Sequence, residues 1–147
     1  MIKKLMLVCL TSISLFAATI EKDVISLVDK AVVAVEKDCK SGIEAIGKKN
    51  GDYHNGSLYV FGYDENVVMV VHPVKPHLIG RSYKGKPDVR GKKFRDEIVS
   101  KALSGGGWTT YTYQKPKTKG MHNKKSYSKI AKCGDKTYIL AAGMYDK

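Results

Sequence analysis

Repeats, biased segments and long apolar runs are scarce in this chain of 147 residues. It contains no low-complexity tract and no internal repeat, which excludes a repeat architecture. After residue 18 no apolar run is long enough to cross a bilayer, because a spanning helix takes roughly 20 residues. The length suits one domain with a single hydrophobic core.

Motifs that carry catalysis are also missing. The chain has no G-x-S-x-G segment, no S-x-x-K segment and no Cys–His arrangement with a base. The glycine triplet at residues 105–107 lacks the Lys-Ser/Thr of a phosphate loop. His72, His77 and His122 do not have the spacing or acidic neighbours of a metal site. We therefore expect no enzyme, no metal and no cofactor.

Cysteine is rare, with three residues. Cys9 is not preceded by the small residues of a lipoprotein cleavage site, which argues against a lipid anchor. Cys39 and Cys133 permit one intramolecular pairing, and in an oxidising compartment such a pair can form a disulfide. The alternative is one buried and one exposed free thiol, since a sequence does not fix the distance between two Cα atoms.

The first 18 residues have the layout of a secretory signal peptide. A short basic stretch over residues 1–4 precedes an apolar run over residues 5–16, and Ala17 and Ala18 follow before charge begins at Glu21. This order predicts cleavage after Ala17 or Ala18. We expect residues 1–18 to be removed and residues 19–147 to form one domain, periplasmic or secreted.

The chain is strongly basic, with 26 Lys and Arg against 14 Asp and Glu, a net charge of +12. Loss of Lys3 and Lys4 with the signal peptide leaves 24 against 14, or +10. In a cytosolic protein this balance would favour nucleic acid as a partner. Export and the absence of a basic arm argue against that, so we expect a solvated basic surface.

Periodicity predicts an α+β domain. Apolar residues at spacings of three or four predict one long helix over residues 20–48. Two nearly continuous apolar runs at residues 58–63 and 67–72 predict a hairpin of buried strands. An irregular segment to residue 92, a short helix over residues 92–104 and strands at 108–114, 124–133 and 137–145 follow. We expect a five-stranded antiparallel sheet with the long helix on one face and the short helix and loop segment on the other.

The order of motifs resembles the single Cache domain of the second type, a PAS-like family of extracytoplasmic sensors. The run LYVFGYDENVVMVVHPVKPHLIGRS, from residue 58, matches the family's first hairpin and the His-Pro and Leu-x-Gly steps after it. KALSGGGWTTYTY, the Lys125-Ser126-Tyr127 step and the terminal AAGMY extend the match over nearly all of residues 51–145. Members are usually the sensing part of a membrane receptor, whereas we expect this chain to lack a transducer of its own.

The resemblance implies a pocket for a small organic anion, such as a short carboxylate, between the sheet and the irregular segment. Lys125 would donate as a cation, Tyr111, Tyr127 and His72 as hydrogen-bond donors, and Trp108, Tyr59 and Phe61 would form apolar walls. Arg81 is a second candidate cation. The alternative is that the aromatic residues are ordinary core and that Lys125 lies in solvent.

Two functions therefore compete. The first is an exported sensor domain that binds a small organic anion and reports it to a membrane receptor or signalling partner. The second is a periplasmic interaction module or accessory subunit, in which the long N-terminal helix mediates homodimerisation or docking.

Overall fold

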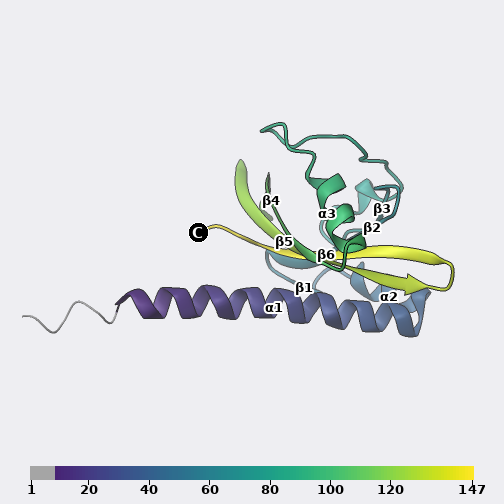
Figure 1. Cartoon of the computed structure of the whole chain (residues 1–147), viewed down its shortest axis with the longest axis horizontal. Coiled ribbons are helices and arrows are strands. Elements are labelled where there is room, and N and C mark those ends of the chain that lie inside the picture. Colours follow the sequence, from purple (N-terminus) through teal and green to yellow (C-terminus); the bar gives the residue numbers. More distant parts are fainter. Residues whose placement is uncertain (1–8) are drawn as a thin grey trace, which may run out of the picture.

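The computed structural model describes the backbone of residues 9–147 and the side chains of residues 20–147. Within this part of the chain, three α-helices and six strands form an α+β fold in layers (Figure 1). Residues 1–8 of the predicted signal peptide lie outside the described residues, and only the backbone of residues 9–18 is described. Cleavage of the signal peptide therefore stays a prediction. Among the helices described, none is both long and apolar enough to span a bilayer.

Helix α1 (Cys9–Lys37) lies along one face of the sheet and extends beyond it at its N-terminal end (Figure 1). Val24, Val28, Ala31 and Val35 follow one another at helical spacing and are all fully buried. A stripe of this kind buries one side of a helix against a partner layer. The predicted packing of a long helix on the sheet is therefore confirmed.

The predicted single helix is wrong at Asp38, where the chain breaks into α1 and α2 (Cys39–Ile46). Asp38 has an extended backbone, and its carboxylate accepts a hydrogen bond of 2.8 Å from the Ser41 N–H. Such N-caps favour the start of a new helix over continuation of the old one. Gly42 then allows α2 to pack closely on α1, because a Cβ there would lie 2.7 Å from the Val35 Cα.

The sheet is antiparallel, in the order β1-β2-β6-β5-β4, with β3 also paired to β2. Its strands are β1 (His54–Asn55), β2 (Leu58–Asp64), β3 (Met69–Val71), β4 (Gly107–Gln114), β5 (Met121–Cys133) and β6 (Lys136–Tyr145). The predicted meander of the last three strands is confirmed. The sixth strand, β1, has two residues and leaves no pattern to read. β3 begins later than predicted because Val67 has a φ of 60° and belongs to the turn.

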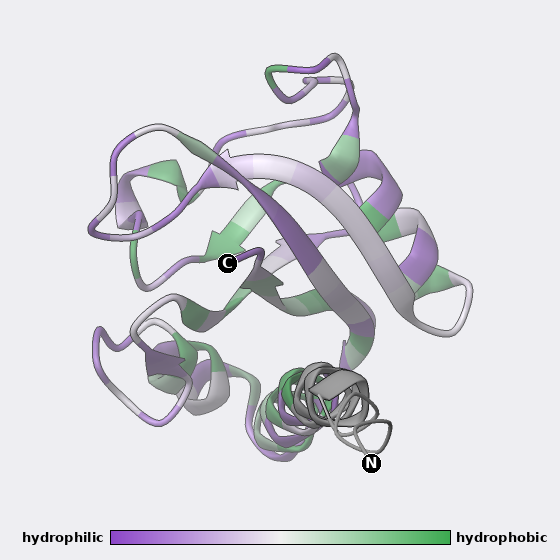
Figure 2. Ribbon diagram, turned by 90° about the vertical axis from the view of Figure 1, so that its left-hand side faces the viewer, coloured by the Kyte–Doolittle hydropathy of each residue, from purple (hydrophilic) through white to green (hydrophobic). Residues whose placement is uncertain are grey.

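The other face of the sheet is closed by residues 72–93 and helix α3 (Phe94–Leu103), which we call the cover. Asp88 fastens it to the sheet: Oδ1 accepts from the N–H groups of Arg90 and Lys92, and Oδ2 accepts from the N–H of Thr112 on β4. Figure 2 shows α1 nearly end-on beneath the sheet and the cover above it. The predicted assignment of the two faces is confirmed.

Alternation along the strands divides the interior into two cores. Val60, Leu140 and Ala142 face α1 and α2. Their strand neighbours Phe61 and Ala141 face the cover. Side chains of successive strand residues point to opposite faces, so the parity of a residue decides which core it joins.

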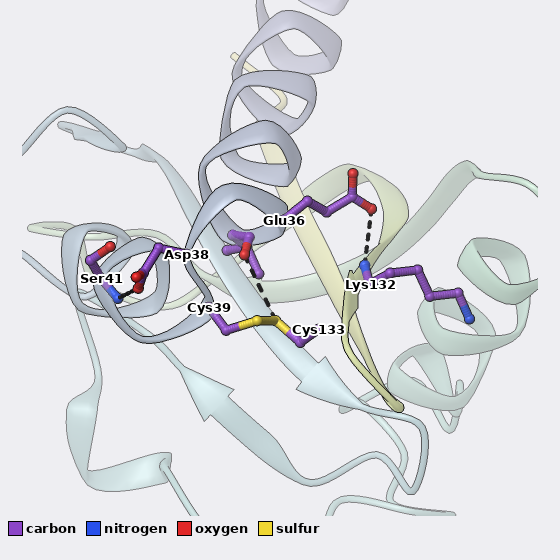
Figure 3. The surroundings of a disulfide bond; sticks show 7 residues. Glu36, Asp38, Cys39, Ser41, Lys132 and Cys133 are labelled. Atoms are coloured by element: carbon purple, nitrogen blue, oxygen red, sulfur yellow. Dashed lines mark hydrogen bonds between the residues drawn. A yellow bond between two sulfur atoms is a disulfide. The ribbon is translucent and has the colours of Figure 1, made fainter.

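Cys39 and Cys133 form a disulfide, with their Cα atoms 5.8 Å apart (Figure 3). The Lys132 N–H donates to Glu36 Oε1 at 3.0 Å beside it. These contacts fasten the end of β5 to the α1–α2 break. The alternative of two free thiols is thus not what the structure shows.

Candidate functional site

Lys124 is the most unusual residue of the cover face. It lies on β5 beside Lys125, which contacts α1, and it is 2% exposed. Gly143 on the neighbouring strand makes room for it, since a Cβ there would lie 2.9 Å from the Lys124 Cε. A lysine is almost never buried to this extent without a charged partner.

Aromatic rings surround the Lys124 ammonium group. Its Nζ lies 4.2 Å from the centroid of the Tyr59 ring and 4.9 Å from that of Tyr145. The rings of Phe61 and Tyr113 lie at 5.0 and 5.5 Å. The Nζ also donates a hydrogen bond of 3.1 Å to the Tyr59 hydroxyl. Cation–π contacts replace part of the hydration that the ammonium loses on burial.

No carboxylate in the described part of the chain forms an ion pair with Lys124. Burial, and then the positive charge of Lys75, lowers the pKa of Lys124 to about 7. A buried cation of this kind gains from any anion that enters beside it. The site therefore holds a buried positive charge that an anionic ligand would balance.

His72 contributes a hydrogen-bond donor to the same site. Its Nδ1 accepts from the backbone N–H groups of Val74 at 3.3 Å and Lys75 at 3.0 Å. A ring nitrogen that accepts carries no proton, so the proton of the neutral ring lies on Nε2. Burial, and then the charge of Lys124, lowers the pKa of His72 to about 3. The ring is thus neutral at physiological pH and offers one N–H.

Two further cations approach the site from the cover. The Arg95 guanidinium stacks at 4.3 Å from the Tyr83 ring and 4.2 Å from the Phe94 ring, and its buried Nε has no hydrogen-bond partner. The Lys75 Nζ lies 4.7 Å from the Tyr113 ring and donates to Gln114 Oε1. Neither residue lines the cavity, but both add positive charge beside it.

The cavity at this site is small. Its volume is about 10 Å³, close to the least that holds one water molecule. Its lining comes from β2, β4, β5, the residue after β3, and the first residue of α3: Tyr59, Phe61, Tyr63, His72, Phe94, Tyr111, Tyr113 and Lys124. Any ligand larger than water must displace side chains of this lining.

The structure separates the predicted site residues into two groups. Tyr59, Phe61, His72 and Tyr111 line the cavity around Lys124. The Tyr111 hydroxyl is hydrogen-bonded to Ser126 Oγ at 2.8 Å, so it is already engaged. Arg81, the second candidate cation, is exposed and does not line the cavity.

Trp108, Lys125 and Tyr127 form the second group, on the α1 face. The rings of Trp108 and Tyr127 lie 5.4 Å apart, and the Lys125 Nζ lies 4.6 Å from the Trp108 ring. The same Nζ forms an ion pair of 2.5 Å with Glu21 of α1. The charge of Lys125, unlike that of Lys124, is therefore matched. Lys125 also lines an open groove of about 410 Å³ with Arg90 and Asp146, and Lys124 and Tyr111 line the same groove.

Sequence reasoning missed Lys124, Tyr113, Tyr145 and Arg95. The signal that could have found Lys124 is the parity of β5. If Cys133 pairs with Cys39 in the helical layer, odd-numbered residues of β5 face that layer and even-numbered ones face the cover. By this parity Lys124 faces the cover and Lys125 faces the helical layer.

Comparison with known proteins agrees with this fold. The family model of Single Cache domain 2 matches residues 1–144. The chain belongs to the single Cache domain 2 family. Cache domains are extracytoplasmic sensors, ligand-binding signalling modules found in chemoreceptors and histidine kinases. The resemblance inferred from the motifs is confirmed.

Two curated relatives of this Cache domain are receptors. It is 29% identical over 91 residues to the sensor histidine kinase MctS of Rhizobium johnstonii, covering 62% of this chain and 19% of the kinase. It is 29% identical over 79 residues to the methyl-accepting chemotaxis protein CtpM of Pseudomonas aeruginosa, covering 54% of this chain and 14% of that protein. The chain thus spans under a fifth of either relative.

Solved structures support the same fold. A methyl-accepting chemotaxis protein from Vibrio parahaemolyticus superposes with a TM-score of 0.75 at 18% identity, covering 90% of this chain and 92% of the other. A Cache chemosensory domain solved to explain carboxylic acid recognition gives 0.73 at 23% identity, covering 91% and 97%. At such identities the likeness establishes the fold alone.

Proposed function

We propose that this Cache domain is a sensor of a short carboxylate, which binds beside Lys124. The observation that carries the proposal is a fully buried ammonium with no anionic partner among the described residues. The solved Cache domain that recognises a carboxylic acid is consistent with this ligand class. The alternative that the aromatic residues are only core does not account for a charge in their midst.

The donors suit a carboxylate. One oxygen would accept from the Lys124 ammonium, which also donates to the Tyr59 hydroxyl. The Nε2–H of His72 supplies a further donor. Charge-assisted bonds of this kind replace the hydration that a carboxylate loses on entry. The surrounding rings would admit a short alkyl tail and reject a long one.

Binding would have to open the cover. The cavity of about 10 Å³ is too small for acetate, so residues 72–93 or α3 must move outward. Asp88 holds this segment on β4 through the Thr112 N–H. This movement would carry the signal to a receptor or kinase partner.

Calorimetric titration with acetate, propionate, lactate and pyruvate tests the proposal. We expect at least one to bind, and Lys124→Met to weaken it by roughly 10- to 150-fold, because a charge-assisted hydrogen bond contributes about 1.5–3 kcal/mol. Lys125→Met is the matched control, one residue away on the opposite face, and should change affinity less than about threefold. Retained affinity in Lys124→Met, with loss in Lys125→Met, would move the site to the residue that the sequence favoured.

We infer an exported location as part of this function. The disulfide between Cys39 and Cys133 and the family's extracytoplasmic role support it. Removal of residues 1–18 as a signal peptide would shorten α1 at its N-terminal end. The intact mass of protein recovered from the periplasm or medium should correspond to a chain that starts at Ala18 or Thr19. A mass that retains residues 1–17 would contradict cleavage.

The second candidate, docking or homodimerisation through α1, rests on the exposed side of this helix, where Val33 is 67% exposed. Its buried stripe is already occupied by the sheet, so a partner would use the exposed side around Lys22, Lys30 and Val33. Sedimentation should then show a dimer that Val33→Glu dissociates. A monomer at high concentration would contradict homodimerisation and would leave the sensor function as the single proposal.

A further inference from the structure

Nearly all of the net charge comes from one segment of the chain. Residues 73–125 contain 14 of the 26 Lys and Arg residues but only 3 of the 14 Asp and Glu residues. This segment therefore carries +11, and the remaining 94 residues together carry +1. The basic balance is not a general property of the surface but belongs to the cover and the β4–β5 hairpin.

The three acidic residues of the segment are all engaged within it. Asp88 accepts backbone N–H groups, and Asp96 accepts the N–H of Gly85 with both oxygens. Glu97 pairs with Lys92 and Lys101. They leave no carboxylate for the exposed cations, which we call the basic surface: Arg81, Lys84, Lys86, Arg90, Lys93, Lys117 and Lys119. None of these seven forms an ion pair within the described residues.

The basic surface lies on one side of the molecule. Residues 74–93 and the turn between β4 and β5 both project from the side of the sheet away from α1 (Figure 1). Contacts tie the two parts together: Lys75 bonds Gln114 at the end of β4, and Asp88 bonds Thr112. The two segments that carry these cations therefore lie on the same side of the fold.

The composition of this side indicates what binds it. Five of the seven cations are lysines, a residue depleted at specific protein–protein interfaces. Among the described side chains, three of the five exposed large apolar residues lie in or next to these loops: Val89 is 66% exposed, Met121, the first residue of β5, 49% and Ile79 47%. Unpaired lysines interspersed with exposed aliphatic side chains suit a bilayer surface, where cations reach phosphates and aliphatic groups reach the acyl boundary.

We propose that the basic surface docks this domain on an anionic lipid bilayer. Docking holds α1 on the far side of the sheet from the lipid. Val89, at an exposed position of the loop pinned by Asp88, enters the headgroup region. The partner is a lipid surface with net negative charge, and its recognition is independent of the carboxylate site around Lys124.

Flotation of the full chain with vesicles tests the docking. We expect binding to vesicles of phosphatidylethanolamine and phosphatidylglycerol, little binding to phosphatidylcholine, and loss of binding in high salt. The variant Lys84→Gln/Arg90→Gln/Lys117→Gln/Lys119→Gln should lower the partition coefficient by roughly tenfold or more. The control Lys22→Gln/Lys40→Gln/Lys48→Gln/Lys49→Gln removes the same charge from exposed positions on α1, α2 and the turn after α2 and should bind as the wild type does.

A second pair of variants separates insertion from charge. Val89→Ser should weaken binding several-fold, whereas Val33→Ser, at an equally exposed position of α1, should not. If the fourfold variant unfolds, its loop pair and its turn pair are measured separately, each with a smaller expected loss. Equal loss in the control variant, or wild-type binding to soluble polyphosphate without binding to anionic vesicles, would overturn the proposal.

Discussion

The α1 face of the sheet is closed by aliphatic side chains, matched charges and a disulfide, whereas the cover face holds aromatic rings around an unmatched lysine. On the α1 face Lys125 and Lys129 pair with Glu21 and Asp29. On the cover face Lys124 has only rings and a phenol. The difference indicates that the α1 face stabilises the fold. On the cover face, burial of the unmatched Lys124 charge costs free energy that a bound anion would offset.

The largest effect is expected on the α1 face. The disulfide closes a chain of 94 residues, and its removal by Cys39→Ala/Cys133→Ala should lower the free energy of unfolding by about 2–5 kcal/mol. Urea unfolding followed by the fluorescence of Trp108 measures it. Carboxylate affinity at a temperature where the variant is folded should change little, because the cavity is on the other face. A large loss of affinity would show that the faces are coupled.

The next effect has the opposite sign and belongs to the cover face. Lys124→Met replaces a buried cation by an apolar side chain of similar volume, and should raise the free energy of unfolding by about 1–4 kcal/mol at pH 6. Because the pKa of Lys124 is lowered to about 7 in the fold, the unfolded chain binds the extra proton between pH 7 and about 10. The wild type should therefore gain stability as pH rises through that range. Unfolding curves at pH 6, 8 and 10 check this, and a variant less stable than the wild type at pH 6 would contradict it.

The affinity for a carboxylate should depend on the same protonation of Lys124. A carboxylate binds the charged form of Lys124, so above pH 7 each pH unit should cost up to about tenfold in affinity. His72, with its pKa lowered to about 3, stays neutral and adds no step in this range. Titrations of the ligand from pH 6 to 9 measure the slope. Constant affinity over this range would exclude Lys124 as the anion partner.

The smallest effect is expected at the ion pair of the α1 face. The Lys125 and Glu21 side chains are 35% and 38% exposed, so solvent screens their attraction. Glu21→Gln should lower the free energy of unfolding by less than about 1 kcal/mol. A loss of several kcal/mol in thermal or urea unfolding would mean that the α1 face also depends on a costly charge.

Much of this comparison could be predicted from the sequence. The helical spacing of Val24 to Val35 predicted the packed side of α1, and the nearly continuous apolar run over residues 58–63 predicted a strand that is covered on both faces. The break at Asp38 could not be foreseen, because the periodicity continues through it and the cap depends on a local hydrogen bond. The prediction chose Lys125 over Lys124 because it did not use strand parity. A shift of one residue in register moves every side chain of a strand to the other face. The cover is irregular, so its contacts through Asp88 and Arg95 left no periodic signal.

The most direct measurement is the titration of Lys124 itself. Carbon-13 labelling of lysine Cε allows its pKa to be followed by NMR, with Lys124→Met to assign the signal. We predict a midpoint near 7 in the free protein and a clear increase when a bound carboxylate supplies the missing negative charge. An ordinary lysine midpoint near 10, unchanged by saturating acetate, propionate, lactate or pyruvate, would contradict the proposal that the buried ammonium is the site of anion recognition.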